Sequence, residues 1–216
     1  MDIADIGGKI AYQFIPFLFA LCFHEYAHGL VAKLRGDNTA EMMGRLTMNP
    51  TAHMDVVGTL ILPLLSIFSG IPIFFGWAKP VPVNSRNLKN ERVDMFWIAL
   101  AGPLSNVFLA FAGTGIIYTV IHYFPQLSLA PAIVKIMSVF ILTNLFLAVF
   151  NIIPLHPLDG GKVLARFLPY KLNRTLEENQ HISSFVLLFL ILFGMLSFLR
   201  IPVILGYNFL TSLAGV

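Results

Sequence analysis

Two histidines and a glutamate stand together at the end of an apolar stretch, in the order His24-Glu25-Tyr26-Ala27-His28. Positions i and i+4 lie on one face of a helix, so both imidazoles could hold one metal ion. Glu25 would lie beside them, where its carboxylate could reach a metal-bound water rather than the metal. Ionisable side chains are costly inside a membrane span unless they face an interior site. The pattern therefore predicts a metal centre, although the three polar residues could instead mark the membrane interface.

A catalytic zinc ion takes three protein ligands and keeps one position for water, so the two histidines require a third partner. Asp159 is the favoured candidate. It lies at the end of residues 151–159, where Pro154 and Pro157 break a helix. An irregular backbone would let a short carboxylate approach an ion on a neighbouring helix. The alternative is that Asp159 caps the helix that follows, a position that Asp favours.

Other polar residues are candidates for lesser roles. His156 is a rival ligand, because imidazole is a common ligand of zinc, although a lone histidine near a helix end more often makes hydrogen bonds. His53 lies in a loop that could fold back over the site as an accessory residue. Asn151 could donate to a developing oxyanion or hold an extended substrate. Asn144 could bond a neighbouring helix, and Asn106 is interpreted as a packing residue.

The amino-acid composition indicates the environment in which these residues lie. Of 216 residues, 57% are hydrophobic and 12% are charged, and the net charge is +3. A soluble domain has about 45–50% apolar and about 25% charged residues. The mean hydropathy of +0.79 agrees with this contrast. The composition excludes a disordered protein and a nucleic-acid binder, and the single cysteine, Cys22, excludes a disulfide scaffold. An integral membrane protein remains.

Hydropathy predicts an all-α polytopic membrane protein with about five to six transmembrane helices. The apolar segments cover residues 10–34, 56–78, 95–121, 136–155, 182–199 and 201–216. The last two are expected to form a C-terminal helical hairpin over 182–216. The polar segments 40–55 and 76–88 are expected to be short edge β-strands or loops at the membrane face, because Pro80 and Pro82 exclude a helix over 76–84.

Basic residues predict the topology. Eleven of the fourteen fall in three loops: Lys33, Arg35, Arg45; Lys79, Arg86, Lys89, Arg92; Lys162, Arg166, Lys171, Arg174. Lys and Arg collect in cytoplasmic loops, so all three loops are expected on that side. Segment 56–78 must then enter and leave on the same side as a re-entrant segment, which is tolerated where it is buried in protein or lines a wet cavity. The alternative is a sixth full span.

Three motifs in this order resemble the site-2 protease family of intramembrane zinc metalloproteases: His24-Glu-Tyr-Ala-His28, Ala101-Gly-Pro-Leu-Ser-Asn106, and Asn151 followed by Leu158-Asp-Gly160. The resemblance covers about residues 10–170 and is to a short form without a PDZ domain. It implies a three-span core with the site near the cytoplasmic face.

The resemblance also implies the roles of the residues. His24, His28 and Asp159 would hold one zinc ion per chain, Glu25 would activate a zinc-bound water, and Asn151 corresponds to the family's asparagine upstream of the Leu-Asp-Gly motif.

The expected function is hydrolysis of peptide bonds in membrane-spanning proteins or peptides. Residues 1–216 would form one integral membrane domain in a prokaryotic cell membrane, with the active site toward the cytoplasm. Segment 76–84 could pair with an unwound substrate. The alternative function is a non-hydrolytic metal transporter or metal sensor. A transporter usually has pseudo-symmetric repeats, and the His-Glu-x-x-His pattern occurs once in this chain.

Overall fold

The computed structural model describes residues 7–69 and 76–216, and the regular structure in these ranges is helical. The elements, in chain order, are η1 (Ile10–Phe14), α2 (Ile15–Leu34), α3 (Thr39–Met42), α4 (Pro50–His53), η2 (Val56–Ile61), α5 (Leu62–Ser69), η3 (Ser85–Asn87), α6 (Glu91–Tyr123), α7 (Ala130–Asn151), α8 (Asp159–Ala165), α9 (Tyr170–Glu178), α10 (Gln180–Leu192), η4 (Ser197–Leu199) and α11 (Arg200–Ala214). The all-α prediction is confirmed.

The predicted β segments are not confirmed, because the described ranges contain no strand. Segment 40–55 contains the short helices α3 and α4, and Pro50 begins the second of these, where its fixed φ suits a first helical position. Segment 76–84 has no regular structure. Its backbone bonds run to other segments, from Trp77 N to Gly58 O at 3.2 Å and from Lys79 N to His53 O at 2.9 Å.

Among the residues that the structure describes, four helices are long and apolar enough to cross a membrane, compared with the five to six that hydropathy predicts. They cover Gly7–Leu34, Glu91–Tyr123, Ala130–Asn151 and Ser197–Ala214. The first three extend or shift the predicted segments 10–34, 95–121 and 136–155 by a few residues. The last corresponds to the predicted segment 201–216.

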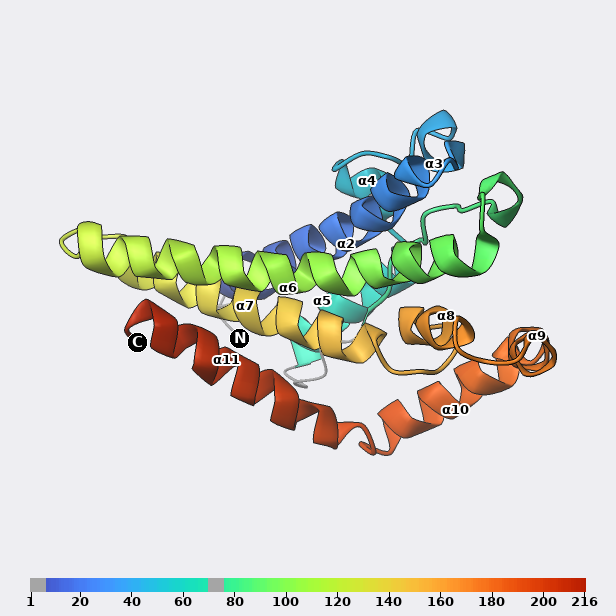
Figure 1. The fold of residues 1–216 in the computed structure, drawn as a ribbon. Helices are drawn as coiled ribbons and strands as arrows, with labels where there is room; N and C mark the ends of the chain where they lie inside the picture. Colours follow the sequence, from blue (N-terminus) through green and yellow to red (C-terminus); the bar gives the residue numbers. More distant parts are fainter. Residues whose placement is uncertain (1–6, 70–75) are drawn as a thin grey trace.

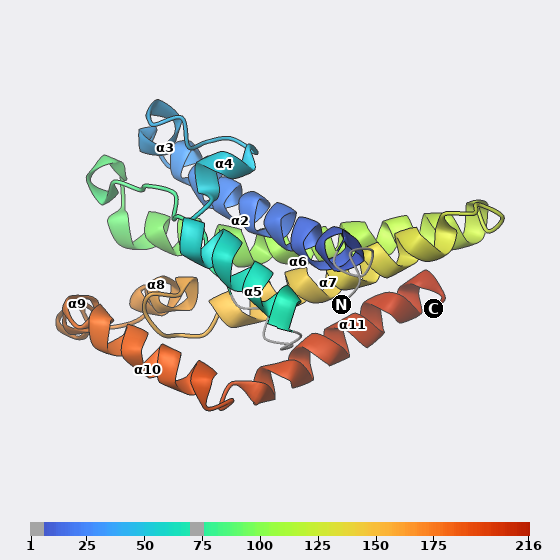
Figure 2. The same cartoon turned by 180° about the vertical axis from the view of Figure 1, so that it is seen from behind.

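Two predicted apolar segments form shorter helices. α10 has 13 residues, fewer than the ~20 that a span needs. The C-terminal segment predicted as a hairpin consists of α10 and α11, which diverge from a bend (Figures 1 and 2). In the predicted re-entrant segment 56–78, η2 and α5 together cover Val56–Ser69. Residues 70–75 of this segment lie outside the described residues.

The core is a bundle of α2, α6 and α7, with α11 along its outer side (Figures 1 and 2). Ala20, Leu109, Phe140 and Leu147 form a buried cluster between the first three helices. A second cluster joins α6 and α7 to α11. Close packing of such side chains is important in a bilayer. Lipid tails are as apolar as the side chains, so burial alone does not drive helices together.

The three basic loops lie at one end of the bundle. The end of α2, the start of α6, and α8 and α9 all lie on the right in Figure 1, whereas the turn between α6 and α7 lies at the opposite end. Figure 2 shows the same grouping from behind. The site residues on α2 and α8 are therefore in the half of the molecule that carries the basic loops.

Candidate metal centre

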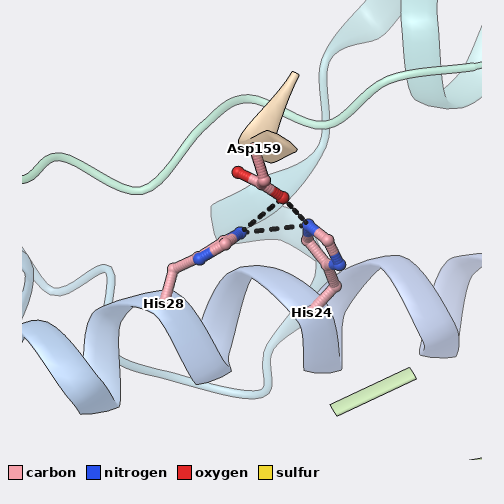
Figure 3. A group of neighbouring side chains, drawn as sticks. All are labelled: His24, His28 and Asp159. Carbon is pink, nitrogen blue, oxygen red and sulfur yellow. Dashed lines mark hydrogen bonds and ion pairs between the residues drawn. The ribbon is translucent and has the colours of Figure 1, made fainter. Parts of the chain in front are cut away.

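His24 and His28 project from one face of α2, as their spacing predicts (Figure 3). Both are buried, with exposed fractions of 5% and 8%. Their Nε2 atoms are 3.0 Å apart. Two imidazole nitrogens this close must share a proton or a cation, since two lone pairs facing each other would repel.

Asp159 brings the third donor from the opposite side (Figure 3). It is the first residue of α8, and its Oδ2 lies 3.1 Å from His24 Nε2 and 3.2 Å from His28 Nε2. The carboxylate of Asp159 does not cap α8, because Leu158 is the N-cap residue and Oδ2 of Asp159 faces the imidazoles.

Glycine is required next to Asp159. A Cβ added at Gly160 would overlap with the carbonyl oxygens of Ile152 and Ile153. The chain therefore folds back tightly on the end of α7 at this point, and this turn brings the start of α8 to the histidines.

The three side chains fit a zinc ion by their donor chemistry. Their ligand atoms all lie within 4.8 Å of one another, and in the described part of the chain they are the one such group of three or more His, Cys, Asp or Glu residues. Asp159 Oδ2 is buried and faces the Nε2 atoms of both imidazoles at 3.1 and 3.2 Å. Three buried electron-pair donors that face one another are costly to leave without a cation between them, and a metal ion would satisfy all three. Two histidines and one carboxylate form a known ligand set of catalytic zinc.

The charge of Asp159 suits this role. Burial raises the pKa of its carboxyl, but the neighbouring His28 and His24 outweigh burial and hold the pKa far below its usual range. Asp159 is therefore an anion at neutral pH.

The outer nitrogens of both imidazoles are bonded to protein acceptors. His28 Nδ1 lies 2.6 Å from the backbone oxygen of Ile98, and His24 Nδ1 lies 2.7 Å from Asn106 Oδ1. Both contacts come from α6. Each leaves Nε2 to face the site, which is the usual arrangement around a histidine that binds metal. The sequence alone favours a packing role for Asn106 and carries no signal for its contact with His24.

α6 also closes one wall of the site. A Cβ added at Gly102 would overlap with both imidazole rings. The glycine of the Ala101-Gly-Pro motif therefore allows α6 to approach the ligands on α2 closely.

Glu25 is held by segment 76–84. Its Oε2 accepts a hydrogen bond of 2.8 Å from Val81 N, and its exposed fraction is 9%. Arg45 fixes the same segment by donating from Nη2 to the carbonyl oxygens of Lys79, at 2.7 Å, and Pro80, at 3.3 Å. The sequence predicts that 76–84 lies at the membrane face, but no local signal predicts its contact with Glu25.

α8 is attached to α6 by Arg92. Its Nη2 donates to the carbonyl oxygens of Ala165, Arg166 and Leu168 at the end of α8. A helix end has unpaired carbonyls, and an arginine there satisfies them and suits the helix dipole. This contact positions the helix that carries Asp159.

The remaining predicted residues lie outside the ligand group. His53 is buried, and its Nε2 lies 2.7 Å from Thr47 O. His156 is buried and its Nε2 makes no hydrogen bond, while burial lowers its pKa. Asn151 donates from Nδ2 to Leu147 O of its own helix at 3.0 Å. These three roles stay predictions.

The chain is similar to one protein family and to individual proteins of known sequence. The model of peptidase family M50 matches residues 114–194, a range that contains Asn151 and Asp159 but not the histidines of α2. The candidate zinc metalloprotease YwhC of Bacillus subtilis is 34% identical over 184 residues, which are 84% of this chain and 80% of YwhC. The candidate zinc metalloprotease Rip2 of Mycobacterium tuberculosis H37Rv is 30% identical over 189 residues, 86% of this chain and 68% of Rip2. No solved structure matches the chain significantly.

Proposed function

The chain belongs to peptidase family M50, the site-2 protease family of intramembrane zinc metalloproteases, and we propose that it hydrolyses peptide bonds of membrane-spanning substrates with Glu25 as the general base. The observation that carries this proposal is the meeting of His24, His28 and Asp159, whose ligand atoms all lie within 4.8 Å of one another although two distant helices supply them. In this arrangement Glu25 follows one ligand directly in the chain.

Each residue has a separate task. His24, His28 and Asp159 would hold zinc, which supplies a Lewis acid that polarises the scissile carbonyl and makes water more acidic. Glu25 takes the proton of the attacking water and hands it to the leaving amine. A general base contributes typically about 10²–10⁴-fold to a rate.

The bond between Val81 N and Glu25 Oε2 supports this role for Glu25. A backbone amide directs one carboxylate oxygen without neutralising the charge, so the other oxygen, Oε1, can accept a proton. The same bond links the base to segment 76–84, which we propose pairs with an unwound substrate. A substrate helix hides its carbonyls in hydrogen bonds and must open locally before it can be cleaved.

Asn151 is proposed to donate to the substrate's developing oxyanion or to hold its backbone. It is the last residue of α7, and eight positions separate it from Asp159. Its amide must turn away from Leu147 O to do so. His53 is proposed as an accessory residue, since its backbone oxygen accepts the bond from Lys79 N in the segment that reaches Glu25.

We further propose the domain organisation and the topology. The whole chain would form one catalytic domain with its core at about residues 10–170, in a prokaryotic cell membrane. The basic loops and the metal site would face the cytoplasm, because positive residues concentrate on that side. Segment 56–78 would be re-entrant, because the basic residues on both sides of it, Arg45 and Lys79, would then lie on the same side of the membrane.

The test compares wild-type protein with Glu25→Gln, both purified in detergent, by zinc content and by cleavage of a membrane-spanning model peptide. We expect the variant to keep one zinc ion per chain and to lose about 10²–10⁴-fold in rate. His28→Ala is the control that should lose zinc together with activity. A zinc-loaded Glu25→Gln protein that cleaves at the wild-type rate would refute the role of Glu25.

The same experiment separates the alternative function. A metal transporter or sensor would bind zinc at the same ligands without cleaving any peptide. The single ligand group in the described residues gives no second site along a transport path.

A further inference from the structure

A chain of hydrogen bonds connects the metal ligand His24 to a backbone oxygen on α7. His24 Nδ1 lies 2.7 Å from Asn106 Oδ1 on α6. Asn106 Nδ2 donates to Asn144 Oδ1 on α7 at 2.9 Å, and Asn144 Nδ2 donates to Phe140 O at 2.8 Å. Both asparagines are fully buried, with exposed fractions of 0%. The chain thus crosses the three core helices.

The direction of every bond in this chain is determined by its far end. A backbone oxygen can only accept, so the amide nitrogen of Asn144 must face Phe140 O. The oxygen of Asn144 then faces Asn106 and can only accept, so Asn106 must present its amide nitrogen there.

A second contact fixes Asn106 in the same orientation. Its Nδ2 also donates to Ala20 O at 3.3 Å, again to an atom that can only accept. The oxygen of Asn106 must therefore face His24, and His24 must carry a proton on Nδ1 to donate to it. The lone pair of the imidazole is then on Nε2, the atom that lies 3.1 Å from Asp159 Oδ2.

Building on the proposed zinc site, we propose that Asn106 and Asn144 are positioning residues that hold His24 as the tautomer which offers Nε2 to the metal. His28 is held as the same tautomer by its Nδ1 contact with the backbone oxygen of Ile98. His24 depends instead on two side chains, which substitution can change. Bonds to the outer nitrogen of a histidine ligand fix its tautomer and raise its basicity, and their loss typically lowers metal affinity by about 10–100-fold.

The test measures zinc affinity of the full chain in detergent by competition with a chelator. Asn106→Leu keeps the size of the side chain and removes the acceptor for His24, so its zinc affinity should fall about 10–100-fold. Asn106→Asp keeps the acceptor and should bind zinc more tightly than Asn106→Leu. Asn144→Leu frees the amide of Asn106 to rotate, so a smaller loss of several-fold is expected.

The matched control is Thr114→Val. Thr114 is also a buried polar residue of α6, but its hydroxyl donates to Ala110 O of its own helix at 2.9 Å and contacts no ligand. Zinc affinity should not change in this variant.

A packing role for Asn106 predicts the opposite order, because an apolar leucine is tolerated between helices and a buried carboxylate is costly. Zinc affinity that is unchanged in Asn106→Leu, or lower in Asn106→Asp than in Asn106→Leu, would overturn the proposal. If Asn106→Leu does not fold, unchanged affinity in Asn144→Leu overturns it. Wild-type protein that binds no zinc would instead overturn the proposed function itself.

Discussion

The two histidine ligands are polar side chains in an apolar bundle, and each has partners on both sides of its ring. The outer nitrogens of His24 and His28 bond to α6, and their inner nitrogens face Asp159. A buried polar atom without a partner is costly, and more so in a membrane. The side chains are therefore held before any metal binds, so that little rearrangement is needed on binding.

At the scale of the residue, a prediction concerns Gly102. Gly102→Ala should lower zinc affinity about tenfold or more, because the added Cβ overlaps with both imidazole rings and displaces them from Asp159. Chelator competition measures this loss. Gly115→Ala is the control on the same helix, since an added Cβ there meets nothing within 4 Å. Equal zinc affinity in the two variants would contradict this prediction, because it would mean that the added Cβ at position 102 does not displace the imidazoles.

At the scale of the element, Asp37 fastens the turn after α2 to η3 and to the N-cap residue of η3. Its Oδ1 accepts from Thr39 N at 3.1 Å and from Asn87 Nδ2 at 2.8 Å, and its Oδ2 accepts from Asn84 N at 2.7 Å. Asp37 is fully buried. The carboxylate thus joins the end of the ligand helix to the last residue of segment 76–84 and to η3, which follows it.

This contact makes stability depend on pH. Burial raises the pKa of Asp37, but hydrogen bonds from Thr39, Asn87 and Asn84 outweigh burial and lower the pKa below its usual value. A carboxyl whose pKa is lower in the folded state stabilises the fold above its unfolded pKa of about 3.9. That contribution is lost as the pH falls from there through the lowered folded pKa.

We therefore expect Asp37→Asn to reduce stability at pH 7 by about 2 kcal/mol, the typical value of hydrogen bonds to a charged group. The difference from wild type should shrink as the pH falls below about 4. Melting temperatures in detergent across this range measure both effects. Glu178→Gln, which alters an exposed ion pair with Arg174, is the control and should leave the melting temperature nearly unchanged. A difference between Asp37→Asn and wild type that is constant with pH would contradict the assignment.

At the scale of the whole molecule, α6 is longer than the hydrocarbon core of a bilayer is thick. Its 33 residues make a helix about 50 Å long, compared with a hydrocarbon core of about 30 Å. Glu91, Arg92 and Asp94 lie in its first turns, at the end of the bundle that carries the basic loops (Figure 1). The site residues contact Ile98, Gly102 and Asn106 in the same half of α6, so we expect water to reach the site from that side.

The topology can be tested with single added cysteines. Lys171→Cys lies in α9 among the basic loops, and Gln126→Cys lies in the turn between α6 and α7. In intact cells a membrane-impermeant maleimide should label Gln126→Cys but not Lys171→Cys, and after permeabilisation it should label both. The native Cys22 is 1% exposed and should not react. Labelling of Lys171→Cys in intact cells would place the basic end outside and reverse the proposed orientation.

Much of the fold follows from properties that are local in sequence. Continuous hydropathy predicts three spans of the core to within a few residues, and the spacing of His24 and His28 places both imidazoles on one face of a helix. The length of α10 could not be predicted in this way, because segment 182–199 is apolar beyond the point where its helix ends at Leu192.

By itself the sequence determined the helices, the ligand pair on α2 and a vacancy for a third ligand, because helix periodicity and hydropathy depend on neighbouring residues. Only the tertiary structure decided which distant groups meet the site. Asn106 reaches His24 across 82 positions, and Val81 reaches Glu25 across 56. Such contacts depend on how the helices pack and how segment 76–84 folds back, and no local propensity encodes that geometry.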